Sequence, residues 1–315
     1  MVTIDLTTPP PPPATFLDGL ARRLALTLPE LRLVADLAGG APLPFDLRQD
    51  GAVPGSGSLS GRLGQSRGSV EDSAYVDALG SLHEPEDSLR RRGLVTDGGA
   101  DPGLVGAVGL LATPRLALDI DVAAGTTQVK AWHRQAGDAV ASLSTCDGIV
   151  FEIAWFPVEQ WTTELARVTA VPEDMPLAAS HVPGLLDVPY ALADSVGEAL
   201  RSGRADLVPV LIDQGEGVVL GDGAELGHAE AAAALSAVHS ESRGRLRILA
   251  AEVSERATAS VGVISWVLLK DGWHSLTPHH DDGARVAVAR VDPDDLATEL
   301  APVLAQVSLG QEASR

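Results

Sequence analysis

The chain has 315 residues, of which 45% are hydrophobic and 21% are charged, and its formal net charge is −20. This is the composition of a globular protein that can bury a sizeable core. The acidic balance argues against binding to nucleic acid or to an anionic membrane, because attraction to phosphate groups needs a basic face. A single cysteine, Cys146, excludes an internal disulfide framework and favours a reducing compartment.

The first residues predict a tail and two helices. Residues 1–15 contain five consecutive prolines, Pro9–Pro13, and are expected to form a flexible tail. Helices are predicted over Phe16–Leu26 and Pro29–Ala38, and the Gly- and Ser-rich stretch 51–68 predicts a flexible loop. The start of the chain lacks a basic region followed by an apolar run, and no run of 18 apolar residues occurs. We therefore expect a soluble, cytoplasmic protein without membrane insertion.

Two stretches of the chain predict the same order of elements, namely three short strands joined by tight turns and then a helix. In the first stretch the strands are Thr126–Gln135, Ala139–Leu143 and Ile149–Trp155, with a helix after Pro157. In the second stretch they are Ala259–Lys270, Trp273–Pro278 and Ala284–Val291, with a helix after Pro293. The dipeptides Gly137-Asp138, Asp147-Gly148, Asp271-Gly272 and Asp282-Gly283 supply the turns.

The landmarks of the two stretches pair at a nearly constant spacing of 134 to 136 residues. The pairs are Trp132 with Trp266, Asp147 with Asp282, Gly148 with Gly283, Pro157 with Pro293, and Thr163-Glu164-Leu165 with Thr298-Glu299-Leu300. We interpret this as an internal duplication of one α+β unit, with halves at about 101–169 and 225–307. Between the halves we expect a loop over Val182–Val188 and a helical middle segment within 185–213, and residues 308–315 form a polar tail.

No pattern in the chain predicts an active site. The sequence Gly64-Gln65-Ser66-Arg67-Gly68 matches the nucleophile-elbow motif, but no strand precedes it, as that motif requires. His274, His279 and Asp281 are a candidate metal site, although neighbouring positions on a strand point in opposite directions. A metal-binding enzyme that uses these three residues therefore stays open as an alternative, and no cofactor is expected.

Four segments of the chain form a recognisable series: Leu89-Arg90-Arg91-Arg92-Gly93-Leu94-Val95, the helix opening Asp101-Pro102, the step Leu110-Leu111-Ala112-Thr113-Pro114, and Gly272-Trp273-His274-Ser275-Leu276-Thr277-Pro278. Together they resemble the EspG family of actinobacterial type VII (ESX) secretion systems. The resemblance extends from Phe16 to Val307 and implies a single domain over 16–307. It also implies an α+β fold of two quasi-two-fold related halves, each an antiparallel β-meander flanked by helices.

The same resemblance implies a cytosolic chaperone and not an enzyme. Its partner would be a PE–PPE-like secreted heterodimer or another helical type VII substrate, kept soluble and directed to its secretion system, and the chain itself would be a monomer or weak dimer. A stable complex buries about 1,600 Å² of surface. The candidate contact residues are Trp132, His133, Arg134 and Gln135 on the first meander, and Glu198, Arg201 and Arg204 in the middle segment. A structural interaction protein of a secretion assembly is a further alternative.

Overall fold

A computed structural model describes residues 21–45, 84–253, 258–279 and 284–302 of the chain. The proline run, the stretch 51–68, the Asp282-Gly283 turn and the tail 308–315 lie outside these residues. The described residues divide into two compact units, the first containing 21–45, 84–117, 131–161 and Val253 and the second containing 118–130, 162–252, 258–279 and 284–302. Among the described helices, none combines the length and the apolar character needed to cross a membrane.

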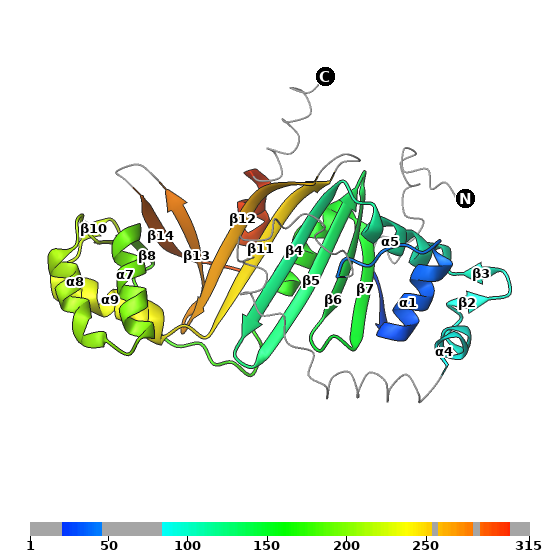
Figure 1. Cartoon of the computed structure of the whole chain (residues 1–315), viewed down its shortest axis with the longest axis horizontal. Coiled ribbons are helices and arrows are strands. Elements are labelled where there is room, and N and C mark those ends of the chain that lie inside the picture. Colours follow the sequence, from blue (N-terminus) through cyan, green and yellow to red (C-terminus); the bar gives the residue numbers. More distant parts are fainter. Residues whose placement is uncertain (1–20, 46–83, 254–257, 280–283, 303–315) are drawn as a thin grey trace, which may run out of the picture. The chain divides into compact units, whose positions relative to one another are not determined.

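The first unit is an antiparallel sheet with three helices packed beside it. Strand β1 pairs with β7, β7 with β6, and β6 is followed in the sheet by β5, while helix α5 packs on β6 and β7 (Figure 1). The elements are β1 (Arg22–Thr27), α1 (Leu28–Leu37), α4 (Pro85–Arg91), β2 (Val95–Thr96), β3 (Gly99–Ala100), α5 (Pro102–Ala112), β5 (Thr127–Ala136), β6 (Ala139–Thr145) and β7 (Val150–Pro157). Their apolar side chains form one core cluster.

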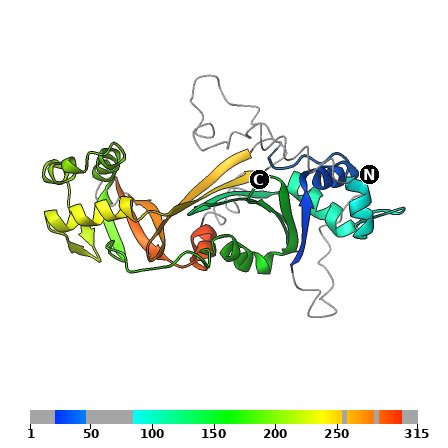
Figure 2. The same cartoon turned by 90° about the horizontal axis from the view of Figure 1, so that it is seen from below.

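The second unit has the same construction. Its strands follow the order β12-β13-β14-β8-β9-β10, and helices α7, α8 and α9 pack on one another beside them (Figures 1 and 2). The elements are β8 (Leu185–Pro189), α7 (Tyr190–Arg201), α8 (Val208–Gln214), β9 (Leu220–Gly221), β10 (Ala224–Glu225), α9 (His228–Ser240), β11 (Gly244–Val253), β12 (Thr258–Leu269), β13 (Gly272–His279), β14 (Arg285–Val291) and a helix over residues 295–302. The α+β class with antiparallel meanders flanked by helices is confirmed.

The duplication is wider than the sequence landmarks indicate. With β4 (Leu116–Ala124) and α6 (Trp161–Val168) included, the order β1-α1-α4-β2-β3-α5-β4-β5-β6-β7-α6 recurs as β8-α7-α8-β9-β10-α9-β11-β12-β13-β14 and the helix 295–302. The pairing registers agree as well, because Thr27 faces Val150 and Pro189 faces Arg285 at the same point of each unit. In both units a helix begins at the next residue along the chain.

Two expectations about the segments that open each repeat are wrong. Residues 22–26, predicted as part of a helix over Phe16–Leu26, belong to strand β1, and residues 185–188, predicted as a loop, belong to strand β8. Both segments turn every second side chain inward: Leu24 is half-buried and Leu26 buried in one, and Leu186 and Val188 are buried in the other. That period of two suits a strand, but five or six residues are too few to separate it from helical periodicity.

The pairing of Trp132 with Trp266 is also wrong by one position. Trp132 packs against the core cluster of α1, α4 and α5, whereas Trp266 donates a hydrogen bond of 2.8 Å to Glu299 in the helix 295–302. In the first unit the residue equivalent to Trp266 is His133, which accepts a 2.9 Å hydrogen bond from Trp161 of α6. Because successive side chains of a strand point to opposite faces, a shift of one residue changes the face.

A buried carboxylate anchors the segment that leads into the second repeat. Glu241, just after α9, is 3% exposed and accepts hydrogen bonds from Ser180 Oγ at 2.7 Å and from the His181 backbone N–H at 3.2 Å. Its Oε1 lies 2.7 Å from His181 Nδ1 and 3.6 Å from Lys270 Nζ. Burial alone would raise the pKa of Glu241, but these partners stabilise the carboxylate and lower its pKa from 4.5 to about 2.

We predict that Glu241 makes the stability of the chain depend on pH in the acidic range. Its folded-state pKa lies below the unfolded value, so its stabilisation is complete above about pH 4.5 and is lost as the pH falls towards 2. Urea denaturation at several pH values between 5 and 3 measures the free energy of unfolding. For the Glu241→Gln variant this free energy should fall less per pH unit than it does for the wild type. The exposed Glu225→Gln is the matched control and should retain the wild-type slope. Equal slopes for the wild type and Glu241→Gln would contradict the assignment.

Candidate functional site

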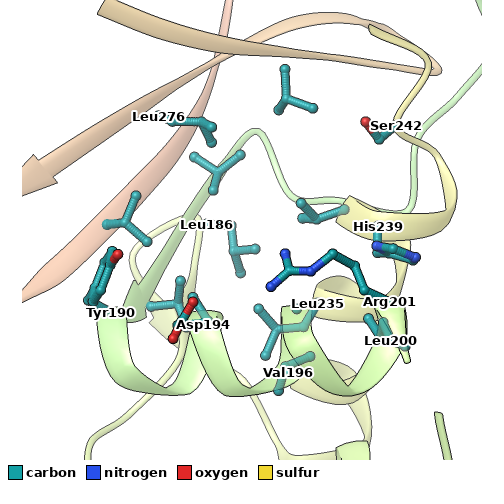
Figure 3. Close-up of a pocket in the computed structure, with 17 residues that line it drawn as sticks. Leu186, Tyr190, Asp194, Val196, Leu200, Arg201, Leu235, His239, Ser242 and Leu276 are labelled. Atoms are coloured by element: carbon teal, nitrogen blue, oxygen red, sulfur yellow. The ribbon is translucent and has the colours of Figure 1, made fainter. Parts of the chain in front are cut away.

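The candidate site is an apolar groove of about 450 Å³ in the second unit. Helices α7 and α9 form its walls, and strands β8, β12, β13 and β14 form its floor (Figure 3). The floor is made by the inward-facing side chains of these strands, namely Leu186, Val188, Val267, Leu276, Val286 and Val288. Concave, mostly apolar sites with a few polar groups are where proteins bind ligands and partner side chains.

Small side chains on α7 leave the groove open. Leu192 of this helix is buried in the core of the second unit, and Val196 belongs to that core and also lines the groove. Ala193 and Gly197, each one residue further along, line the groove as well. Because residues four apart lie above one another on a helix, these two positions form a continuous strip with little side-chain volume.

The edge of the groove is polar. Asp194 and Arg201 from α7, His239 from α9 and Ser242 after it line the groove, and Arg201 extends towards its middle in Figure 3. Arg201 Nη2 donates a 2.9 Å hydrogen bond to Glu198 Oε2, which lowers the pKa of Glu198 below its ordinary value. An apolar floor within a polar rim is the usual anatomy of a protein–protein interface.

The residues predicted on the first meander are mostly inside the protein. His133 is 2% exposed and Arg134 is 4% exposed, with Arg134 Nη1 donating to the His133 carbonyl at 3.1 Å. Trp132 is half-buried, and its ring centroid lies 5.7 Å from that of Phe45. Gln135 donates to the Gly137 carbonyl in the adjacent turn. We do not retain His133 and Arg134 as contact residues, because their side chains present almost no surface to a partner.

The residues predicted in the middle segment lie at or near the groove. Glu198, Arg201 and Arg204 are exposed, and Arg201 lines the groove itself. Arg204 follows α7 and makes a bidentate pair with Asp206, with both distances at 2.9 Å. The residues that sequence reasoning missed are the apolar ones, such as Leu186, Leu276 and Val286, which come together from distant parts of the chain.

The residues of the alternative metal site are not brought together. His274 is fully buried, with Nε2 3.8 Å from Asp271 Oδ1, and burial lowers its pKa. His279 Nε2 lies 3.1 Å from Asp187 Oδ1, which also accepts a hydrogen bond from Arg285. Five residues apart on one strand, the two histidines face opposite sides of the sheet. Asp281 is outside the described residues, and no cluster of three potential ligands occurs in the part of the chain that the structure describes.

Comparisons with known proteins identify a fold and no sequence family. No protein-family model matches the chain, and no curated protein matches its sequence. Its structure is similar to a solved chaperone structure from Mycobacterium tuberculosis, the type VII secretion system chaperone EspG5 in complex with a PE25–PPE41 dimer. The similarity has a TM-score of 0.58 at 11% sequence identity and covers 90% of this chain and 96% of the other. The resemblance inferred from short motifs is thus confirmed at the level of the fold.

We predict that Gly197 keeps the groove open at a cost in stability. A Cβ at this position would meet Arg201 Nη1 at 3.5 Å, an ordinary contact. Gly197→Ala should therefore stabilise α7 by roughly 0.5–1 kcal/mol, the usual gain for replacing a helical glycine. Urea denaturation measures this gain. The control Gly217→Ala should destabilise, since Gly217 has φ +95° and its Cβ would lie 2.9 Å from Pro189 Cγ. Destabilisation by Gly197→Ala would contradict the described packing.

Proposed function

We propose that this protein is a type VII secretion chaperone that holds a helical PE–PPE-like heterodimer by its apolar tip. The client is kept soluble in the cytoplasm and is delivered to its secretion system, and the chain performs no chemistry of its own. The observation that carries the proposal is the open apolar groove between α7, α9 and the sheet. The fold shared with a chaperone solved in complex with a PE–PPE dimer supports it.

The physical basis of the proposed capture is the removal of two apolar surfaces from water. Contact between an exposed apolar groove and an exposed apolar helix tip stabilises the complex by about 25 cal/mol for each Å² of apolar surface buried. A stable complex buries about 1,600 Å² in total, so the client must also cover surface beyond the groove. The exposed face of α7, which carries Glu198 and Arg201, continues the rim and is the part of that surface where charge can select a partner.

A charge placed in the groove should weaken capture. Leu200 lines the groove and is half-buried, so Leu200→Asp leaves a carboxylate facing the apolar client. We expect affinity for a co-expressed PE–PPE-like heterodimer from the same genome to fall at least about tenfold, the equivalent of 1.4 kcal/mol. Size-exclusion chromatography and isothermal titration calorimetry measure complex formation and affinity. The expected accompanying result is that the client becomes insoluble in cells that express the variant.

The matched control is Leu177→Asp, at a leucine that is 53% exposed and lies outside the groove. It should bind as the wild type does. A second variant, Arg201→Glu, changes only an exposed side chain and separates loss of binding from loss of folding. Wild-type capture by both Leu200→Asp and Arg201→Glu would overturn the proposed site. Failure of the wild type to bind any such heterodimer would instead favour a structural role in a secretion assembly.

A further inference from the structure

The first unit contains a counterpart of the groove. In β1 and β7, Leu26 faces Phe151 and Leu24 faces Ile153. In β8 and β14, Val188 faces Val286 and Leu186 faces Val288 at the same positions of the register. Since α1 and α7 each begin directly after the strand, Leu31 corresponds to Ala193 and Ala35 to Gly197.

This counterpart is filled by the protein's own chain. After α1, the segment Ala41–Phe45 buries Leu43 to 2% exposure in the core cluster of the first unit. The Phe45 ring stacks on Phe151, with a centroid distance of 5.2 Å and an interplanar angle of 29°, and also contacts Trp132. Phe151 is the residue equivalent to Val286, which lies in the floor of the open groove. The segment therefore covers the position that is open in the second unit.

In the second unit the chain follows a different path after its helix. The Arg204 backbone N–H donates to the Ala199 carbonyl at 2.8 Å, and the Leu207 N–H donates to the Arg204 carbonyl at 3.0 Å. These bonds turn the chain back against the end of α7 and lead it directly into α8. With Ala193 and Val286 where the first unit has Leu31 and Phe151, the second unit has less side-chain volume at these positions.

We propose that Ala41–Phe45 is a built-in occupant of the first unit's docking position, so that, within the part of the chain that the structure describes, this position is open in the second unit and occupied by the chain itself in the first. Pro42 and Pro44 flank Leu43 and restrict its backbone, which lowers the entropy lost when the segment covers the sheet. The inference concerns apolar ligands in general and rests on the proposed function only for the number of clients that one chain holds.

The number of binding sites for 8-anilinonaphthalene-1-sulfonate, an anionic dye whose aromatic rings bind apolar surfaces, tests the proposal on the full chain. The wild type should bind one dye molecule per chain in the open groove. Phe45→Ala should add a second site by uncovering Phe151. The double variant Ala193→Leu with Val286→Phe gives the second unit the side chains of the first, and it should remove the original site. All three substitutions together should leave one site.

Two controls separate an opened site from general loosening of the core. Phe45→Leu keeps an apolar cover and should bind dye as the wild type does. Val108→Ala removes volume from the same cluster at a residue of α5 and leaves Phe45 in place, so it should add no site. If Phe45→Ala adds no site, or if Val108→Ala adds the same site, the inference is wrong.

A peptide experiment tests the same idea without any change to the chain. Acetyl-Ala-Pro-Leu-Pro-Phe-amide, the sequence of the occupant segment, should displace the dye from the wild-type groove, and the peptide ending in alanine should not. If Phe45→Ala fails to fold, absence of displacement by the first peptide overturns the inference. Dye binding as expected without capture of any PE–PPE-like dimer would leave the inference standing and contradict only the proposed function.

Discussion

Close packing of the protein interior is the constraint on which the proposed function depends. Protein interiors are packed as densely as organic crystals, and an apolar surface left without neighbouring atoms loses dispersion contacts and stays in contact with water. In the first unit, Phe45, Trp132 and Phe151 bring their rings together over the sheet. In the second unit, Ala193 and Val286 leave the equivalent space open as a groove. A partner that fills this space gains the contacts that the fold itself does not supply.

Under the proposed function, the duplicated architecture lets one chain be stable and also bind a partner. Each unit covers its sheet with helices that follow the same order, so the hydrogen bonding and most of the core are built twice. The first unit packs Leu43 and Phe45 against its core cluster, whereas the second retains Gly197 and Ala193 beside an apolar floor. Stability and binding can therefore be assigned to different copies of one design, as expected where activity requires locally unfavourable packing.

Sequence reasoning succeeded where a local signal determines structure. The turns at Gly137-Asp138 and Asp271-Gly272 and the helix cap at Asp101 are present, because left-handed glycines and capping carboxylates are local requirements. It failed for β1 and β8, where short alternating segments become strands only because β7 and β14 offer paired edges. Trp132 pairs with Trp266 only by residue type. Strand register determines the face of the sheet on which each side chain lies.

The groove could not be predicted from the sequence, because it is a property of side chains that meet only after folding. Leu186, Leu276 and Val286 come from three strands separated by up to a hundred residues. One signal was available: alignment of the two repeats by their strand-to-helix junctions shows Ala193 opposite Leu31, the loss of a large side chain at a core position. That alignment required β1 and β8 to be recognised as strands. Arg201 was found through its helix, and the structure places it on the rim.

Hydrogen–deuterium exchange of the full chain, with and without a saturating PE–PPE-like dimer, tests the central claim most directly. Exchange reports local protection residue by residue, so it locates the bound surface without any mutation. The account predicts slower exchange in α7, α9 and β14 on binding, with α1 and α5 unchanged. Protection confined to the first unit, or a stable complex with no change in α7 and α9, would contradict it.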